Sequence, residues 1–176
     1  MTLKPIYLCG FMGVGKSTAG RLLAEKLGLV FYDIDQKVMK SAGKTISEIF
    51  ADDGESKFRE LETKAIAFIA DLGPSVVALG GGALNAPANQ KRIKENGILI
   101  YLSASLKTLT TRLQSTSESR PLLAGLSDAA RAERITTMLQ TREAIYKTAD
   151  FQISTDGRDA AAVAQDILQE LRRRLS

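Results

Sequence analysis

The chain has 176 residues, of which 44% are hydrophobic and 25% are charged, and its formal net charge is +4 without any histidine. Length and composition fit one globular domain, residues 1–176, and make a second full domain improbable. The basic excess suits anionic ligands but falls short of a nucleic-acid-binding protein, and no apolar run approaches the ~20 residues of a membrane span. We therefore expect neither a nucleic acid nor a membrane as a partner.

Along the chain, short β-rich runs alternate with longer helical patterns. The candidate strands are residues 6–9, 30–33, 76–79, 98–102 and 151–154. The candidate helices are residues 18–27, 35–41, 46–50, 55–72, 89–95, 106–114, 128–148 and 159–175. Strands that are separated by helices predict an α/β fold, a three-layer sandwich around a five-stranded parallel sheet.

The first strand contains Cys9, the single cysteine of the chain. It can form no disulfide within the chain, so it is expected to be a buried small hydrophobe. The first ten residues contain one lysine and an apolar run that is too short for a signal peptide. We expect a cytoplasmic protein that acts as a monomer.

A phosphate-binding loop follows the first strand. Residues 10–17 read Gly-Phe-Met-Gly-Val-Gly-Lys-Ser, the complete pattern G-x-x-x-x-G-K-[ST]. Glycines let successive backbone N–H groups face one anion, Lys16 can reach the β- and γ-phosphates, and Ser17 offers a hydroxyl to Mg²⁺. Strand, loop and helix come in the required order, so we expect a nucleoside triphosphate to bind. The residues expected to contact it here are Gly13, Val14, Gly15, Lys16, Ser17 and Thr18.

Two carboxylates follow the second strand, at Asp33 and Asp35. In such sheets, ligands gather beyond the carboxyl ends of the strands. Alternate residues of an extended strand share a face, so both carboxylates are expected to point toward one cleft. Either residue could also cap the next helix, which would not exclude a role in chemistry.

Three glycines, Gly80, Gly81 and Gly82, follow the third strand. A triplet in this place would let a substrate lie against bare backbone, but a flexible turn explains it equally well. The strand ends without the acidic residue that many phosphate-loop proteins carry there, which weakens an ATPase-motor interpretation.

Residues 113–127 show no regular period and contain one arginine, Arg120. We interpret them as a mobile lid, because a kinase must keep water away from the γ-phosphate. A solvated loop of this length without a function is less common.

Six segments in order resemble the shikimate kinase family. They are residues 10–18 (G-x-x-G-x-G-K-S-T), 31–35 (F-Y-D-x-D), 58–62 (F-R-E-x-E), 80–82 (G-G-G), 120–123 (R-P-L-L) and 142–146 (R-x-x-x-Y). The phosphate loop alone indicates only the P-loop NTPase superfamily, with a fold like that of the nucleoside monophosphate kinases. The ordered set, which runs nearly end to end, is far more specific.

The resemblance implies that ATP phosphorylates the 3-hydroxyl of shikimate, a step toward chorismate and the aromatic amino acids. By its pattern, Arg59 and Arg142 would hold the shikimate carboxylate, and Asp35 would orient or deprotonate the attacking hydroxyl. Gly81 and Gly82 would add backbone contacts to the substrate.

Rate in such an enzyme should come from positioning and from cations around the transferring group. Lys16, Mg²⁺ and Arg120 are those cations, so the resemblance implies Lys16, Asp35 and Arg120 as catalytic residues. Ser17 and Asp33, the latter directly or through water, would hold Mg²⁺ together with the nucleotide phosphates.

The resemblance also assigns regions of the chain. Residues 34–62 would form a helical substrate-binding segment, and Arg120 would reach ATP when the lid closes. Arg158, after the last strand, is expected near the adenine, with Arg112 as a second candidate by position. Tyr146 is expected to pack rather than to take part in chemistry.

Simpler interpretations compete at both substrate-binding arginines. Arg59 lies four residues after Glu55 and three before Glu62, so it could pair with either glutamate on one helix. Arg142 has the same ambiguity with Glu143.

Two other functions fit parts of the sequence. Another small-molecule kinase, such as a gluconate kinase or a nucleoside monophosphate kinase, would share the loop and the lid. A nucleotide acceptor needs a base-binding surface that we do not find, and gluconate is disfavoured mainly by the family-specific motifs. A regulatory module without turnover should lack a reactive group, whereas all the expected ones are present.

Overall fold

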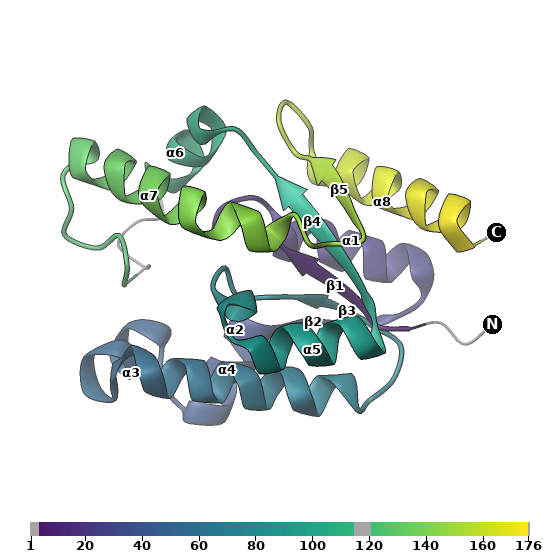
Figure 1. The fold of residues 1–176 in the computed structure, drawn as a ribbon, viewed down its shortest axis with the longest axis horizontal. Coiled ribbons are helices and arrows are strands. Elements are labelled where there is room, and N and C mark those ends of the chain that lie inside the picture. Colours follow the sequence, from purple (N-terminus) through teal and green to yellow (C-terminus); the bar gives the residue numbers. More distant parts are fainter. Residues whose placement is uncertain (1–3, 115–120, 176) are drawn as a thin grey trace.

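The structure is a computed structural model that describes residues 4–114 and 121–175. At its centre, five parallel strands form one sheet in the order β2-β3-β1-β4-β5 (Figure 1). The strands are β1 (Ile6–Cys9), β2 (Val30–Asp33), β3 (Ser75–Ala78), β4 (Ile98–Ser103) and β5 (Phe151–Ser154). β1 and β3 are buried at every position, as is usual where helices cover both faces of a parallel sheet.

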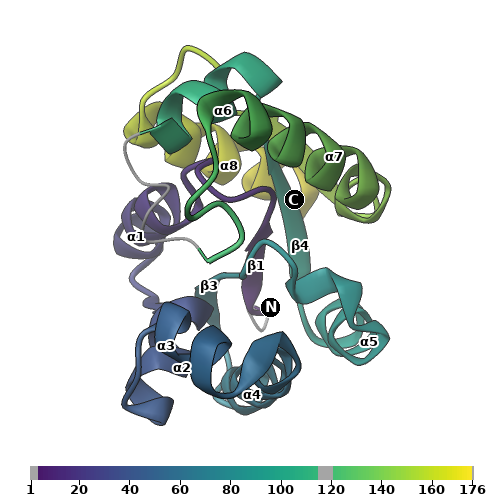
Figure 2. The same cartoon turned by 90° about the vertical axis from the view of Figure 1, so that its left-hand side faces the viewer.

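Helices lie on both faces of this sheet (Figures 1 and 2). The α1 and α8 helices pack together on one face, and α4, α5 and α7 lie on the other. The helices are α1 (Lys16–Leu27), α2 (Ile34–Ala42), α3 (Ile46–Asp52), α4 (Gly54–Ala70), α5 (Pro87–Asn96), α6 (Leu106–Gln114), α7 (Asp128–Tyr146) and α8 (Ala160–Leu175). The predicted three-layer α/β sandwich is confirmed.

All predicted strands and helices are found, with ends that shift by one or two residues. One short element was not predicted, a single 3₁₀ turn, η1 (Ala83–Asn85), between β3 and α5. Three residues are too few to show a period, and this turn is closed by Asn85 N–H, which donates to the Gly82 carbonyl at 3.0 Å. It carries the chain from the glycine triplet to α5.

The expectation that Asp33 and Asp35 share the face of a strand is wrong. β2 ends at Asp33, whose carboxylate caps α2 by accepting a hydrogen bond from Gln36 N–H, so Asp35 lies in the first turn of that helix. The capping alternative is confirmed for Asp33. A helical turn rather than strand alternation therefore decides where the two carboxylates point.

The core is centred on β1, where Cys9 is buried as predicted. In the described part of the chain, no helix is both long and apolar enough to cross a membrane. Because all five strands run the same way, their carboxyl ends meet at one edge, which carries the candidate site.

Candidate functional site

The phosphate loop joins β1 to α1 in a conformation that requires glycine. Gly15, at φ 100°, is the residue before α1, and Gly10, at φ 135°, turns the chain away from β1 where a Cβ would collide with the Leu102 carbonyl. Lys16 folds back over the loop, and its ammonium donates to the carbonyls of Gly10 at 2.9 Å and Phe11 at 3.0 Å. The cation is thereby held at the mouth of the loop, next to the N-terminus of α1.

Ser17 and Asp33 come together beside this loop. The Ser17 hydroxyl donates to Asp33 Oδ2 at 2.5 Å, while Oδ1 of the same carboxylate caps α2. A hydroxyl and a carboxylate oxygen are donors that Mg²⁺ prefers, and that ion commonly takes one or two protein ligands alongside phosphates and water. The pair fits the magnesium site predicted from the sequence.

Three pockets lie side by side along the edge of the sheet. The middle one, here the phosphate pocket, contains residues of the loop together with both aspartates and a residue of α6. Its lining is Met12, Gly13, Gly15, Lys16, Ser17, Thr18, Asp33, Asp35, Leu79, Gly81 and Arg112. Although they lie on different elements, Asp33 and Asp35 thus face the same space.

On one side lies the acceptor pocket, which combines two arginines, a buried glutamate and the glycine triplet with an apolar floor. Its lining is Met12, Asp35, Ile46, Phe50, Phe58, Arg59, Glu62, Gly80, Gly81, Gly82, Pro121, Leu122 and Arg142. The residues that it shares with the phosphate pocket are Met12, Asp35 and Gly81. The Asp35 side chain therefore stands at the wall between the two.

On the other side lies the nucleoside pocket, between the loop and the segment after β5. Arg112 of α6 spans it, donating to the Val14 carbonyl at 3.3 Å and to the Thr155 carbonyl and hydroxyl, each at 3.1 Å. Arg158 also lines this pocket but pairs with Asp166 at 2.5 Å. Arg112 borders both the phosphate and nucleoside pockets, which makes it the more central of the two candidates.

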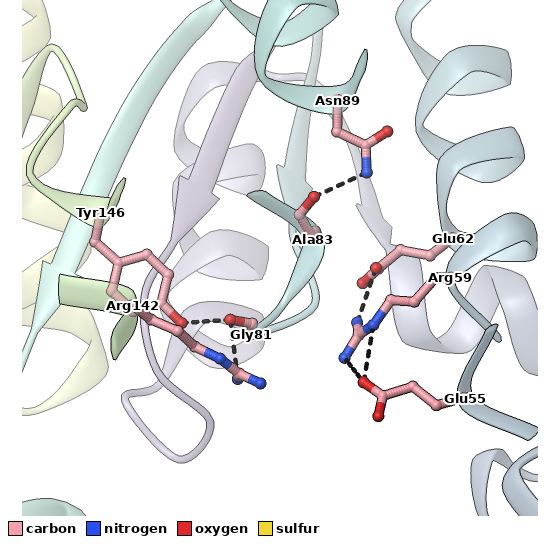
Figure 3. Close-up of polar contacts among 8 residues, drawn as sticks. All are labelled: Glu55, Arg59, Glu62, Gly81, Ala83, Asn89, Arg142 and Tyr146. Carbon is pink, nitrogen blue, oxygen red and sulfur yellow. Dashed lines mark hydrogen bonds and ion pairs between the residues drawn. The ribbon is translucent and has the colours of Figure 1, made fainter. Parts of the chain in front are cut away.

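Arg59 is held by two glutamates of its own helix (Figure 3). Its Nη1 contacts Glu62 at 2.9 Å, and its Nη2 contacts Glu55 at the same distance, so Arg59 forms the ion pair with each of the two glutamates that the sequence offered as alternative partners. With a third bond from Nε to Glu55, three of five N–H donors are engaged by described residues. Each terminal nitrogen keeps one N–H that no described residue engages, in a side chain that lines the acceptor pocket.

Glu62 was given no role from the sequence, where it entered as the last residue of the F-R-E-x-E segment and as one possible ion-pair partner of Arg59. Its side chain is 1% exposed, and burial raises its pKa, an effect that Arg59 opposes and the charge of Asp35 reinforces. Its spacing from Arg59 was the available signal, but spacing does not distinguish a surface pair from a buried one. Here the glutamate fixes Arg59 from inside the protein.

Arg142 reaches the acceptor pocket from α7 and is 9% exposed. It donates to the Gly81 carbonyl at 3.2 Å, and in Figure 3 its guanidinium approaches the same space as that of Arg59. The alternative pairing with Glu143 is not found, because Glu143 pairs with Lys147 at 3.0 Å one turn further along the helix. Two cations from separate helices therefore converge on one pocket.

Close approach of side chains explains two of the three glycines. A Cβ on Gly82 would lie 2.7 Å from Arg59 Nη2, and a Cβ on Gly80 would collide with Glu62 Oε1 and lie 3.0 Å from Asp35 Oδ1. A larger residue at either position would displace the Arg59 or Glu62 side chain from the place it occupies here.

A family model described as "Shikimate kinase" matches residues 12–172. The chain belongs to the shikimate kinase family. Shikimate kinases of Thermodesulfovibrio yellowstonii and Persephonella marina are each 42% identical to it, over 97% of this chain and 96% and 100% of theirs. The solved structure "Shikimate kinase from Acinetobacter baumannii in complex with shikimate" superposes with a TM-score of 0.93 at 35% identity, covering 98% of this chain and 95% of that one.

A gluconokinase from Sinorhizobium meliloti has a TM-score of 0.59 at 17% identity, covering 97% of this chain and 92% of its own. That likeness shows a shared fold and nothing finer.

Among the residues that the shikimate kinase resemblance assigned, the structure brings Asp35, Arg59 and Arg142 to one pocket. Arg120 lies outside the described residues, as does most of the lid before Pro121. The part that follows is anchored, since Leu123 is fully buried and Ser127 caps α7. Pro121 and Leu122 lie against the acceptor pocket, so the described end of the lid segment borders the predicted substrate site.

Proposed function

We propose that the protein is a shikimate kinase, which transfers the γ-phosphate of ATP to the 3-hydroxyl of shikimate and releases shikimate 3-phosphate and ADP. This reaction belongs to the synthesis of chorismate and the aromatic amino acids. The observation that carries the proposal is the acceptor pocket, which adjoins the phosphate pocket and holds one carboxylate at the shared wall and two arginines. Membership of the family supports the same substrate.

The acceptor pocket matches the chemistry of shikimate, a small ring that bears one carboxylate and three hydroxyls. Arg59 and Arg142 would bind the carboxylate, which suits guanidinium groups whose remaining N–H donors face one space. Gly81 and Gly82 would add backbone contacts to the ring hydroxyls. The apolar floor would lie against the carbon ring.

Asp35 would act on the reacting hydroxyl. Its carboxylate accepts the proton of the 3-hydroxyl as that oxygen forms its bond to the γ-phosphorus. The bond from phosphorus to the oxygen bridging the β- and γ-phosphates breaks, and its electron pair leaves with ADP. Asp35 lines both pockets, which supports a role at the point where acceptor and donor would meet.

Cations would stabilise the charge that moves during transfer. Lys16 would exchange its contacts with the loop carbonyls for the β- and γ-phosphates, and Arg120 would arrive from the lid at residues 113–127. Ser17 and Asp33 would hold Mg²⁺, which supplies neutralisation of the phosphate charge when bound. The loop residues, with Arg112 and Arg158, would bind the rest of ATP.

We also propose that residues 1–176 act as one kinase domain whose substrate-binding part is residues 34–62. The protein works as a monomer in the cytoplasm, and its partners are ATP and shikimate.

The direct test is an assay of purified protein in which ADP release is followed with ATP and Mg²⁺, with and without shikimate. We expect ADP to appear in step with shikimate 3-phosphate, identified by phosphorus NMR. Gluconate and AMP serve as matched control acceptors and should give only the background rate. Shikimate that elicits no ADP above background would overturn the proposal.

A further inference from the structure

The hydroxyl of Tyr146 donates a hydrogen bond to the carbonyl of Gly81, a residue that lines the acceptor pocket, and packing alone does not explain this contact. Tyr146 follows Arg142 by four residues on α7, so both side chains lie on the same face of the helix. Both donate to one acceptor, the carbonyl of Gly81 (Figure 3). A carbonyl oxygen has two lone pairs and can accept both.

The shared acceptor is part of the site itself. Gly81 lines both the acceptor pocket and the phosphate pocket, in the short segment between β3 and η1. Since glycine restrains its own backbone weakly, the orientation of this peptide depends on the groups that bind it. The two donors from α7 are therefore what ties the middle of the triplet to the opposite wall.

The Tyr146 side chain, which donates one of these two hydrogen bonds, is held rigidly. Tyr146 is 1% exposed, and its ring stacks on Tyr101 of β4 with centroids 5.3 Å apart and planes inclined by 29°. Burial raises the pKa of Tyr146 further above the neutral range, so the hydroxyl keeps its proton as a permanent donor. Because its ring is held against Tyr101 of β4 and its hydroxyl does not ionise, Tyr146 can hold the Gly81 carbonyl in a fixed position.

We infer that Tyr146 is a positioning residue of the acceptor pocket, whose hydroxyl holds the Gly81 carbonyl and thereby sets the orientation of Arg142 toward an acceptor carboxylate. This inference rests on the proposed function of the pocket. Without the hydroxyl, the Gly81 carbonyl has Arg142 as its remaining side-chain donor among the described residues. The guanidinium is then drawn toward the carbonyl, or the peptide turns, and in either case the pocket is less preorganised for an anion.

The test is Tyr146→Phe, which keeps the ring and its stacking but removes the hydroxyl. We expect the KM for shikimate to rise roughly three- to tenfold, the size of one net hydrogen bond, while kcat and the KM for ATP stay within about twofold. The dissociation constant of shikimate, measured by calorimetry without ATP, should rise by the same factor. Tyr101→Phe is the matched control, since it makes the same change in the stacking partner, and it should leave both constants unchanged.

A thermal melt of each variant separates positioning from packing. If Tyr146 only packs, Tyr146→Phe lowers the melting temperature and leaves the shikimate constants unchanged, which would overturn the inference. A rise in the KM for ATP equal to that for shikimate would overturn it as well. Wild-type protein without shikimate-dependent ADP release would instead refute the proposed function, so the two failures are distinguishable.

Discussion

The two halves of the site are built in different ways. The phosphate pocket comes mainly from one continuous stretch, residues 10–18, where backbone geometry and a helix N-terminus create the anion site. The acceptor pocket is assembled mainly from side chains on α2, α3, α4 and α7 around the glycine triplet. A local motif can therefore pass unchanged between kinases of this fold, whereas acceptor specificity depends on how distant segments pack.

Asp35→Asn should give the largest effect, because this residue stands where the two halves meet. The amide cannot accept the proton of the attacking hydroxyl, so we expect kcat to fall by up to about 10⁴-fold. ATP affinity, measured by calorimetry, should stay nearly unchanged, since the nucleotide half is intact. A parallel loss of ATP affinity would show that Asp35 belongs to the nucleotide half instead.

Lys16→Met tests whether the function of the phosphate pocket can be lost while the acceptor pocket still binds shikimate. Loss of the ammonium removes the cation held over the loop, and kcat should fall by about 10³-fold. Shikimate binding in the absence of ATP should match the wild-type protein, because no residue of the acceptor pocket is changed. Weaker shikimate binding would mean that the two halves do not act separately.

Arg120→Ala should have a smaller effect, about 10²-fold on kcat, with a much weaker effect on shikimate affinity. The residue is assigned from the sequence alone and is proposed to stabilise the transferring group. Arg158→Ala is a useful comparison, since a residue at the nucleoside pocket should change mainly the KM for ATP. Equal effects of Arg120→Ala on kcat and on shikimate binding would argue against a transition-state role.

The same contrast explains how far the sequence could be read. Alternation of strands and helices and the local loop motif predicted the sheet, its layers and the position of Lys16. The roles of Glu62 and Tyr146 were not predicted from the sequence, because they depend on burial and on contacts with segments far away along the chain, such as Gly81. Asp35 was assigned correctly to a pocket for the wrong reason, since β2 ends two residues earlier than strand alternation requires.

Glu62→Gln tests how Arg59 is held in the acceptor pocket, and we expect it to have the smallest effect on the kinetic constants of these substitutions. The amide can still accept from Arg59 but carries no charge, and a charge-assisted bond is roughly twice as strong as a neutral one. We expect the KM for shikimate to rise several-fold with kcat little changed. Glu55→Gln, at the half-exposed end of the same arginine, is the matched control and should change much less, as is usual for surface pairs.

The pH dependence of stability tests the burial of Glu62 further. Because burial raises the pKa of Glu62, the folded protein binds its proton more tightly than the unfolded chain does. This contribution to the free energy of unfolding is fully present below the usual carboxyl pKa of 4.5 and is lost as the pH rises through the raised value. Urea unfolding across that window should show Glu62→Gln losing less stability with rising pH than the wild-type protein. If Glu62→Gln followed the wild-type curve, Glu62 would not be the buried, proton-binding partner of Arg59, and the acceptor pocket would have to hold that arginine in another way.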